Sequence, residues 1–437
     1  MKNMLSKLEY LPVSELKPDP RNPRRHTREQ IAAIARSEHA FGFNAPILAE
    51  RSGTIIAGHG RWEAAKTIGL AQVPVIFLDH LTPQQVRAYQ IADNRLTERS
   101  CWDEEVLGQN FKELSDMALD FDIQATGFEL PEIDLRIQSL EDAPPQDADD
   151  SFAVSEGPAV SRKGDLFMLG EHRLYCGDAL EASSYDAVLA GEKASAVFAD
   201  APYNVKIDGH VCGSGTIKHR EFAMATGEMD EQQFTAFLGA WMGHCSNNAL
   251  PGAVIFSCMD FRHLDEMSAA AKANTFELLN LCVWVKTAAG MGSFYRSKHE
   301  LIFVYRKPGS SHINNIQLGR FGRDRSNVWN YAGANIRPRK GAENLLSLHP
   351  TVKPVMLVAD AMRDATRRGD IVLDPFVGSG TTLLAAERVG RRGYGIELDP
   401  IYVDTAIRRW QRKTGKPARH QSRASFDELA AGRSEHP

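Results

Sequence analysis

The distribution of hydrophobic residues toward the C-terminal end of the chain predicts a strand, a tight turn, a helix and a second strand in succession. The short apolar run Ile371–Leu373 is typical of a buried strand. Apolar residues at helical spacing predict a helix over Thr381–Val389, which Gly390 ends. A second strand is predicted over Gly393–Glu397. The chain is therefore expected to turn sharply between residues 374 and 380.

This turn contains Gly378 and Gly380, which allow close approach of the backbone. A strand, a glycine turn and a helix start direct free backbone N–H groups and the helix dipole toward one point, as in nucleotide sites. Glu397 follows Asp374 by about 20 residues, the spacing at which a carboxylate binds a ribose diol. The alternative is an ordinary strand–helix turn in which the glycines serve packing.

The ligand predicted for this turn is an adenosine without phosphates. The dinucleotide fingerprint G-x-G-x-x-G and the phosphate loop ending in G-K-[ST] are absent, and no lysine follows the glycines. Acids before and after the turn, with few positive groups, favour S-adenosylmethionine as the cofactor.

A second motif lies earlier in the chain, at the end of an apolar run that begins at Val197. It reads Asp200-Ala201-Pro202-Tyr203. Together the two motifs resemble the Asp-Pro-Pro-Tyr and Asp-Pro-Phe-x-Gly-Ser-Gly-Thr-Thr signatures of the DNA amino-methyltransferases, which act on exocyclic nitrogens of adenine or cytosine. Because the glycine motif comes second here, the resemblance is to the permuted, beta-type branch of that family. It covers roughly residues 161–412.

The resemblance implies an α/β fold, a Rossmann-like sheet of the S-adenosylmethionine-dependent methyltransferases. It assigns catalysis to Asp200, Ala201, Pro202 and Tyr203. It assigns cofactor binding to Asp178, Lys353, Asp374, Pro375, Phe376, Gly378, Ser379, Gly380, Thr381, Thr382 and Glu397. Asp178 follows a predicted hairpin and is equally well explained as a turn aspartate. Lys353 lies in a family word, residues 349–354, that leads into a helix.

The chemistry implied for these residues is activation of a weak nucleophile. The lone pair of an exocyclic amine is delocalised into the base, and two hydrogen-bond acceptors beside the N–H groups counteract this. The carboxylate of Asp200 and the backbone carbonyl of Ala201 would supply them, although the family has proline at position 201. The base would be flipped out of the duplex and stacked on Tyr203. No metal and no cysteine nucleophile is implied, since no Pro-Cys pair occurs.

Hydrophobic patterning near the start of the chain predicts a second, smaller α/β unit. A helix is expected over Arg28–Glu38, a hairpin over residues 46–57, a helix after a glycine turn at Gly58 and a strand over Val73–Phe77. With Asn22-Pro23-Arg24 and the turn at residues 58–61, this order resembles the ParB/sulfiredoxin-like domain. Arg24 and Arg61 are the candidate phosphate ligands, whereas Trp62 replaces the second arginine of the family's turn. Nucleotide binding, DNA association and a purely structural role all remain open.

The predicted domains follow from these assignments. They are a ParB/sulfiredoxin-like domain at 1–100, a helical extension at 101–140, an acidic proline-bearing linker at 141–160, a DNA methyltransferase domain at 161–414 and a disordered polar tail at 415–437. Within the methyltransferase domain, the catalytic half spans 161–305, target recognition 306–348 and the cofactor half 349–414.

Basic residues gather in the predicted target-recognition segment. They are Arg306, Lys307, Arg320, Arg323, Arg325, Arg337, Arg339 and Lys340, against the single acid Asp324 in residues 306–340. Clustered Lys and Arg neutralise phosphates, so this segment is predicted to bind double-stranded DNA. The net charge of the 437-residue chain is −5, so DNA affinity must come from such a local surface. A solvated charged loop is the alternative.

Composition adds limits on the class of protein. The six cysteines form no C-x-x-C pair, which indicates reduced thiols and a cytoplasmic protein. No apolar run has the roughly 18 residues of a membrane span, and no secretory signal is predicted. His210, Cys212 and His219 lie close together, but no fourth ligand has the spacing of a structural zinc site, so flexible loop residues are expected.

The resemblance leaves several functions open. Asp at the first motif position favours N6 of adenine, with N4 of cytosine as the alternative. A catalytically decayed DNA-binding or partition-type adaptor is favoured only by Ala201. An RNA or protein methyltransferase fits less well with the basic segment. No nuclease constellation is present, so a restriction–modification context would require a separate nuclease, and a homodimer remains an option.

Overall fold

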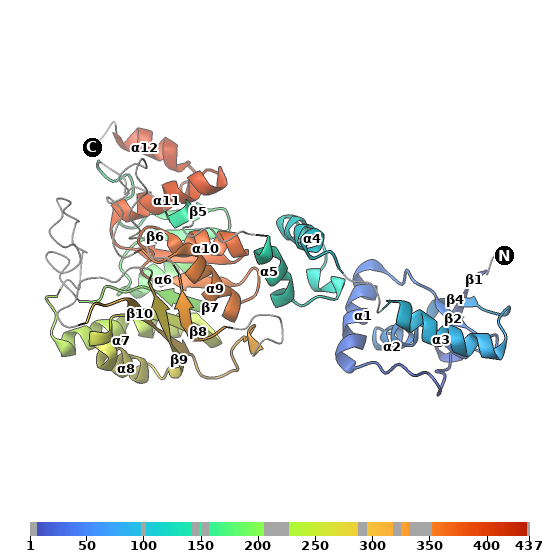
Figure 1. The fold of residues 1–437 in the computed structure, drawn as a ribbon. Coiled ribbons are helices and arrows are strands. Elements are labelled where there is room, and N and C mark those ends of the chain that lie inside the picture. The colour runs from blue at the N-terminus through green and yellow to red at the C-terminus, as the bar shows by residue number, and fades with distance from the viewer. Residues whose placement is uncertain are drawn as a thin grey trace, which may run out of the picture. The chain divides into compact units, whose positions relative to one another are not determined.

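The computed structural model describes residues 7–97, 102–140, 148–150, 157–204, 227–286, 295–317, 325–331 and 352–434 (Figure 1). The chain forms two compact units, Met1–Glu141 and Asp142–Pro437. No helix within the described residues combines the length and the apolar character needed to cross a membrane.

The first unit contains a four-stranded sheet in the order β1-β4-β2-β3. Its elements are β1 (Leu8–Pro12), α1 (Arg28–Phe41), β2 (Ile47–Ala49), β3 (Ile55–Ala57), α2 (His59–Thr67), β4 (Gln72–Phe77) and α3 (Pro83–Thr97). The predicted hairpin is present, because β2 and β3 pair antiparallel across Gly53. Gly53 has φ +82°, and a Cβ there would lie 2.4 Å from the carbonyl oxygen of Glu15, so only glycine fits this turn.

Two further helices follow in the same unit, α4 (Glu104–Asp116) and α5 (Leu130–Ser139). The side chain of Asp103 caps α4 by accepting from the N–H of Val106 at 3.1 Å. Phe111 and Ile133 are buried where the two helices pack together. These helices occupy residues that the sequence pattern predicts as helical.

The second unit is built on a ten-stranded sheet in the order β11-β9-β10-β8-β7-β12-β13-β6-β5-β14 (Figure 1). Its strands are β5 (Leu166–Leu169), β6 (His172–Cys176), β7 (Ala194–Ala199), β8 (Ala249–Met259), β9 (Glu277–Val285), β10 (His299–Arg306), β11 (Val328–Asn330), β12 (Ile371–Asp374), β13 (Arg392–Glu397) and β14 (Arg419–His420). The central strands β8, β7, β12, β13 and β6 run parallel, and β10 is antiparallel to both neighbours.

Helices cover both faces of this sheet. They are α6 (Ala182–Leu189), α7 (Glu231–Asn248), α8 (Leu264–Ala273), α9 (Val355–Ala365), α10 (Thr381–Val389), α11 (Pro400–Thr414) and α12 (Phe426–Ser434). Apolar residues of α9, α10 and α11 pack in one core cluster and those of α6, α7 and α8 in another. The predicted α/β class is confirmed, and a sheet covered on both faces explains the near-continuous apolar character of β7 and β12.

The prediction of a disordered tail after residue 414 is wrong. β14 pairs antiparallel with β5, and Phe426 is buried against Phe167 with ring centroids 5.9 Å apart. Arg433 at the end of α12 forms an ion pair with the buried carboxylate of Asp165. The prediction relied on the polar composition of the tail, which gives no signal for these few contacts.

Residues 148–150 of the predicted acidic linker contact the second unit. Asp149 pairs with Lys413 at 2.8 Å, and Asp150 accepts from the N–H of Val355 at 2.8 Å. These acids are therefore docked on the second unit and are not solvated. Polar composition indicated exposure, whereas the basic side chains of α11 and the N-terminus of α9 provide partners.

Candidate active site

The two sequence motifs meet because their strands are neighbours. β7 and β12 pair in parallel, with Val197 opposite Leu373. Asp200 directly follows β7 and Asp374 ends β12, so both acids lie at the carboxyl edge of the sheet, where open α/β sheets bind ligands. The charge of Asp200 also contributes to raising the pKa of Asp374. The two motifs thus share one edge of the sheet.

The carboxylate of Asp200 is held by two neighbouring side chains. The ammonium of Lys353 lies 2.7 Å from each of its oxygens. The hydroxyl of Tyr203 donates to Oδ1 at 2.8 Å. Burial and the charge of Glu300 raise the pKa of Asp200, whereas Lys353 and Tyr203 oppose the rise. The side chain of Asp200 retains 26% exposure, against 4% for Lys353, so Asp200 is accessible and Lys353 lies behind it.

Sequence reasoning placed Lys353 with the cofactor residues and did not assign Glu300 to the site. The structure pairs these two side chains at 2.9 Å, and Glu300 also pairs with Lys286. Although burial raises the pKa of Glu300, the ammonium groups of Lys353 and Lys286 lower it to about 2. An acid directly before the apolar run of β10 was the available signal for Glu300, since acids are seldom enclosed without a partner.

Two carboxylates accept hydrogen bonds from the predicted cofactor turn and the residues beside it. Asp374 accepts from the N–H of Phe376 at 2.8 Å and from the hydroxyl of Thr382 at 2.5 Å. Glu397 accepts from the N–H of Gly378 at 2.8 Å and from that of Asp399 at 2.8 Å. Glu397 therefore lies beside the glycine turn, as its spacing from Asp374 predicts.

Asp374 is buried and Glu397 is half-buried, and no cation is among these contacts. Burial raises the pKa of Asp374 to about 7, and Asp200 and Glu397 add to the rise. Burial likewise raises the pKa of Glu397 to about 7, with Asp399 adding to it. Such carboxylates favour a ligand that supplies hydroxyl or amino donors and positive charge. An adenosine with a sulfonium group fits this donor set.

Glycines give the turn its shape. Gly380 has φ +91°, and a Cβ on it would lie 2.7 Å from the Cβ of Ala406. A Cβ on Gly395 would lie 2.1 Å from a methyl carbon of Val377. A larger residue at position 380 would push the turn away from α11, and one at position 395 would push it away from β13. The close approach that the glycine spacing predicted is therefore a property of this fold.

The other predicted cofactor residues surround the turn. Pro375, Ser379 and Thr381 belong to it, and the ring of Phe376 packs edge-on against Trp241 at 5.6 Å. Sequence reasoning missed Arg409, whose buried guanidinium donates to the carbonyl and hydroxyl oxygens of Ser379 at 2.7 and 2.9 Å.

Asp178 follows β6, next to the end of β13. Its Oδ1 accepts from the N–H of Leu180 at 2.9 Å, the contact of a turn aspartate, and the neighbouring Gly177 donates to the carbonyl of Glu397 at 2.9 Å. Both interpretations of Asp178 thus remain compatible with its place.

The remaining residues of the catalytic motif form a short segment after β7. Ala201 is buried, and Pro202 is half-buried. Asn204 then adopts φ +53°, and its side chain binds the N–H of Gly227 at 3.0 Å and the carbonyl of Met229 at 2.8 Å. Asn204 thereby joins the two ends of the segment 205–226. That segment, with His210, Cys212 and His219, lies outside the described residues, among which no cluster of three or more potential metal ligands occurs.

The predicted DNA-binding residues do not form one basic surface in the described part of the chain. Arg325 is enclosed by Asp360 at 3.1 Å and Asp364 at 2.9 Å, and Lys307 donates to the carbonyls of Ser246 and Ala249. The charge of Arg325 is thus balanced by internal carboxylates and Lys307 caps backbone carbonyls, while their assignment to phosphates stays a prediction. Arg306 pairs with Glu277 at the surface.

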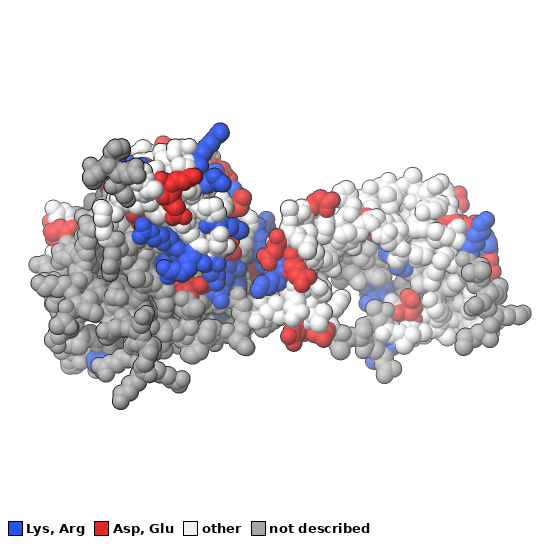
Figure 2. All heavy atoms as spheres, turned by 90° about the horizontal axis from the view of Figure 1, so that it is seen from above, with Lys and Arg blue, Asp and Glu red and all other residues white. Residues whose placement is uncertain are grey.

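The other basic residues of the segment are not described. They are Arg320, Arg323, Arg337, Arg339 and Lys340. On the face of the second unit seen in Figure 2, Lys and Arg side chains lie beside Asp and Glu side chains.

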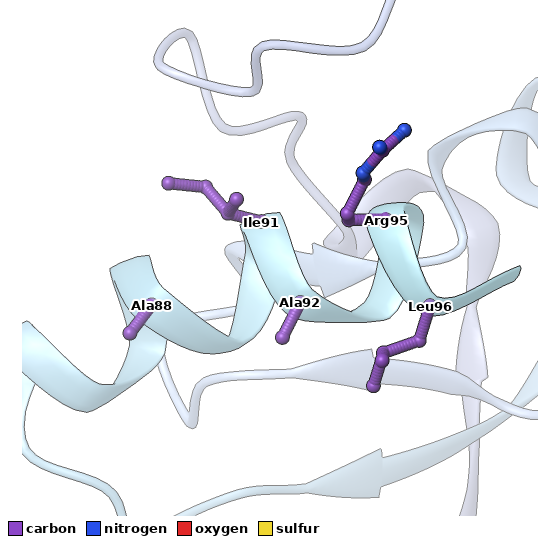
Figure 3. A pocket seen from close by; sticks show the side chains of 5 residues that line it. All are labelled: Ala88, Ile91, Ala92, Arg95 and Leu96. Carbon is purple, nitrogen blue, oxygen red and sulfur yellow. The ribbon is translucent and has the colours of Figure 1, made fainter. Parts of the chain in front are cut away.

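In the first unit, Arg24 and Arg61 both face α3. Arg24 donates to the side chain of Asn94 at 3.2 Å, and Asp93 and Glu38 are the acids that interact with the half-buried Arg61. A hollow of 390 Å³ on another part of α3 is lined by Ala88, Ile91, Ala92, Arg95 and Leu96 (Figure 3). This lining is largely apolar and includes neither predicted phosphate ligand.

Comparison with known proteins gives three matches along the chain. Residues 194–408 match the model of a DNA methylase, residues 2–94 that of the ParB N-terminal domain and residues 105–163 that of a ParB-methyltransferase HTH domain. The HTH match covers α4 and α5, to which sequence reasoning gave no function.

Individual relatives cover about a third to a half of the chain. A type II methyltransferase of Streptococcus pneumoniae, M2.DpnII, is 27% identical over 230 residues, which are 50% of this chain and 82% of the relative. The crystal structure of an M1.HpyAVI–SAM complex is 21% identical, covering 54% of this chain and 97% of that one, with a TM-score of 0.40. Truncated ParB from Caulobacter crescentus, complexed with CTP-gamma-S, is 24% identical, covering 31% and 81%, with a TM-score of 0.28. Residues 194–408 of the chain thus match the DNA methylases, and a segment that matches the ParB N-terminal domain precedes them.

Proposed function

We propose that the protein transfers a methyl group from S-adenosylmethionine to the exocyclic amine of a flipped base at a specific DNA site, with N6 of adenine as the favoured target. The observation that carries this proposal is the meeting of Asp200 and the Asp374 turn at the ends of neighbouring parallel strands. One motif offers hydrogen-bond acceptors, and the other offers a pocket for an adenosine. A methyl donor and an amine acceptor would share this edge.

Cofactor binding would rest on the acids and the glycine turn. Glu397 would accept from the ribose hydroxyls, and the buried Asp374 would face the positive end of the ligand. The N–H groups at the start of α10 and the turn held by Arg409 would complete the cradle. When bound, the cofactor supplies an electrophilic methyl group on a sulfonium sulfur.

The chain's own residues would then prepare the amine. The exposed part of the Asp200 carboxylate and the carbonyl of Ala201 would accept its two N–H groups, which frees the nitrogen lone pair for in-line attack. Alanine at position 201 keeps that carbonyl. It loses the φ restriction of proline, worth roughly 0.4–1 kcal/mol of chain entropy.

The base must leave the duplex to reach Asp200, at a cost of a few kcal/mol. Stacking on the ring of Tyr203 would return about 1–3 kcal/mol. The hydroxyl of Tyr203 is held by Asp200 at 2.8 Å, so the ring has a fixed orientation before the base arrives. A preset ring lowers the ordering cost of base binding.

Sequencing of DNA from cells that express the protein, with a method that detects modified bases, tests both the activity and the base. Methylated adenine at one recurring sequence is expected. Methylation at N4 of cytosine would replace the adenine assignment and leave the reaction class intact. Unmodified DNA, combined with retained DNA binding, would favour the decayed adaptor.

A second proposal concerns the first unit, where Arg24 and Arg61 would bind a nucleotide. Within the described residues, Nε of Arg61 and both carboxylate oxygens of Glu38 are buried without a hydrogen-bond partner. A ligand with both acceptors and donors would satisfy these groups. Titration of the full chain with labelled CTP or ATP tests this, with Arg61→Met as the matched variant. Absence of saturable binding contradicts it.

A further inference from the structure

Four charged side chains form a closed set behind the proposed target site. Lys353 contacts both oxygens of Asp200 at 2.7 Å and Oε2 of Glu300 at 2.9 Å, and Lys286 contacts the other oxygen of Glu300. The set holds two carboxylates and two ammonium groups, so its charges balance. It joins the end of β7, the start of β10, the end of β9 and the segment before α9.

We propose that Lys353 and Glu300 are positioning residues for Asp200. Lys353 keeps the Asp200 carboxylate ionised and fixes its rotation, so that one oxygen still presents a free lone pair to the target amine, and Glu300 holds Lys353 in that place. This inference deepens the proposed function and rests on it. It moves Lys353 from the cofactor residues to the base-binding side of the site.

The geometry supports a positioning role. A carboxylate oxygen can accept two hydrogen bonds. Lys353 uses one position on each oxygen of Asp200, and Tyr203 uses the second position on Oδ1. Counting the contacts of the described residues, the second position on Oδ2 is left for a base. Lys353 is 4% exposed and Asp200 26%, so a base can approach Asp200 from the open side without displacing the ammonium.

The charges indicate what Lys353 prevents. Tyr203 bridges the two carboxylates, with its hydroxyl 2.8 Å from Asp200 and 3.3 Å from Glu300. Without Lys353, two buried carboxylates would share this site, and such pairs take up one proton. Glu300 would keep Lys286 as its partner, so the proton would go to Asp200. A protonated Asp200 donates a hydrogen bond in place of accepting one and cannot activate the amine.

The surroundings of Asp200 consist of a few ionisable groups. Lys353 and Tyr203 contact it directly, and Glu300, Asp374 and Cys258 act on it or on its partners from the neighbouring strands. Lys353 also lies 5.4 Å from the ring centroid of Tyr203 and 5.8 Å from that of Trp284, distances at which an aromatic face attracts a cation. These contacts hold the ammonium in place from several sides.

The test is the pH dependence of kcat/KM for DNA methylation, whose acidic limb reports the essential group of the free enzyme. Lys353→Met is expected to move this limb upward by at least about one pH unit, so that activity lost near neutral pH returns at higher pH. Glu300→Gln removes a charge that raises the pKa of Asp200. The acidic limb of this variant should therefore move to lower pH or stay in place, and its kcat should be lower. Lys353→Arg should restore most of the wild-type profile.

The double variant Lys353→Met with Glu300→Gln separates electrostatic from structural effects. It removes both the ammonium of Lys353 and the repelling carboxylate of Glu300, so its acidic limb should lie closer to the wild-type position than that of Lys353→Met. The matched control is Glu277→Gln on β9, which breaks a surface pair with Arg306 of β10. This variant should leave the pH profile of kcat/KM unchanged. Calorimetry with S-adenosylhomocysteine should show near-wild-type affinity for Lys353→Met.

Three results would overturn the inference. They are an unshifted limb in Lys353→Met, an upward shift in Glu300→Gln and a selective loss of S-adenosylhomocysteine binding in Lys353→Met. If Lys353→Met does not fold, Lys353→Arg and Glu300→Gln still decide between the outcomes. A wild-type protein that methylates no DNA contradicts the proposed function itself and is thereby distinguished from a failure of this inference.

Discussion

The ammonium of Lys353 lies 2.7 Å from both carboxylate oxygens of Asp200, although 153 positions separate the two residues in the chain. Asp200 is the first residue after β7, and Lys353 immediately precedes Pro354, the N-cap of α9. A bidentate ammonium–carboxylate contact of this kind fixes the carboxylate more firmly than a single hydrogen bond. The acceptor of the site is thus oriented before any base arrives.

Replacing Asp200 by alanine is expected to abolish methyl transfer while leaving the cofactor turn intact. The variant removes the acceptor from the amine, and Lys353 keeps Glu300 as a partner. Incorporation of tritiated methyl groups into DNA should fall by at least about 100-fold. Asp260→Ala, at the carboxyl end of the neighbouring strand β8, is the control and should retain activity. Substantial methylation by Asp200→Ala would contradict the assignment.

Replacing Glu397 by alanine is expected to weaken cofactor binding selectively. The carboxylate holds the N–H groups of Gly378 and Asp399, and it would bind the ribose as well. A loss of tenfold or more in affinity, about 1.4 kcal/mol, should appear in calorimetry with S-adenosylhomocysteine. Glu397→Gln keeps one acceptor oxygen, so its affinity for S-adenosylhomocysteine should lie between those of the wild type and Glu397→Ala. Unchanged affinity in Glu397→Ala would refute the role.

The buried acids predict a defined pH dependence of stability. Burial raises the pKa of Asp374 and of Glu397 to about 7, above ordinary unfolded values of about 3.9 and 4.3. The folded protein therefore binds more protons than the unfolded chain between about pH 4 and 7. The stabilisation from these two groups is full below pH 4 and is lost as the pH rises through 7.

Denaturant unfolding at several pH values measures this effect. In Asp374→Asn, the free energy of unfolding should decline less between pH 4 and 7 than it does in the wild type. Because a cofactor that donates to these carboxylates favours their ionised forms, its binding near pH 7 should release protons. Calorimetry in two buffers of different ionisation enthalpy detects that release, and proton uptake would contradict the prediction.

Replacing Arg325 by methionine is expected to destabilise the second unit without weakening phosphate contacts. The guanidinium is buried between Asp360 and Asp364, and these two carboxylates raise its pKa further despite its burial. Removing one partner of a buried ion pair costs about 3–5 kcal/mol. The surface variant Arg306→Met should cost less than about 1 kcal/mol.

Salt titration of DNA binding separates this role from a DNA contact. Loss of one phosphate contact reduces the slope of log affinity against log salt concentration by about one. An unchanged slope in Arg325→Met, with a lower denaturation midpoint, is the expected result. A reduced slope with an unchanged denaturation midpoint would instead identify Arg325 as a DNA-binding residue.

Replacing Phe426 by alanine is expected to show that the end of the chain is part of the fold. Phe426 is fully enclosed, and its ring packs against Phe167 of β5. Truncating a buried phenylalanine costs about 3–5 kcal/mol. Leu429, which is only partly buried beside it, offers a milder comparison as Leu429→Ala. A wild-type melting temperature for Phe426→Ala would mean that the tail does not contribute to the core.

The local elements of both units were largely predictable. The hairpin at Gly53, the helix Thr381–Val389 and the strand that ends in Glu397 follow from short-range periodicity and from the conformations that glycine permits. Elements whose stability comes from contacts with distant parts of the chain were not predictable from the sequence. Helix α12 has few apolar residues, and only the burial of Phe426 against another strand shows why it is ordered.

The sequence by itself determined the two motifs, their order and the chemistry that each could perform, because these depend on residue types at short spacing. Only the tertiary structure decided the partners. It brought Lys353 and Glu300 to Asp200, and it enclosed Arg325 between two aspartates. The physical reason is that a charged side chain is defined by the charges within a few ångströms of it. In this protein those neighbours come from strands and helices far away along the chain.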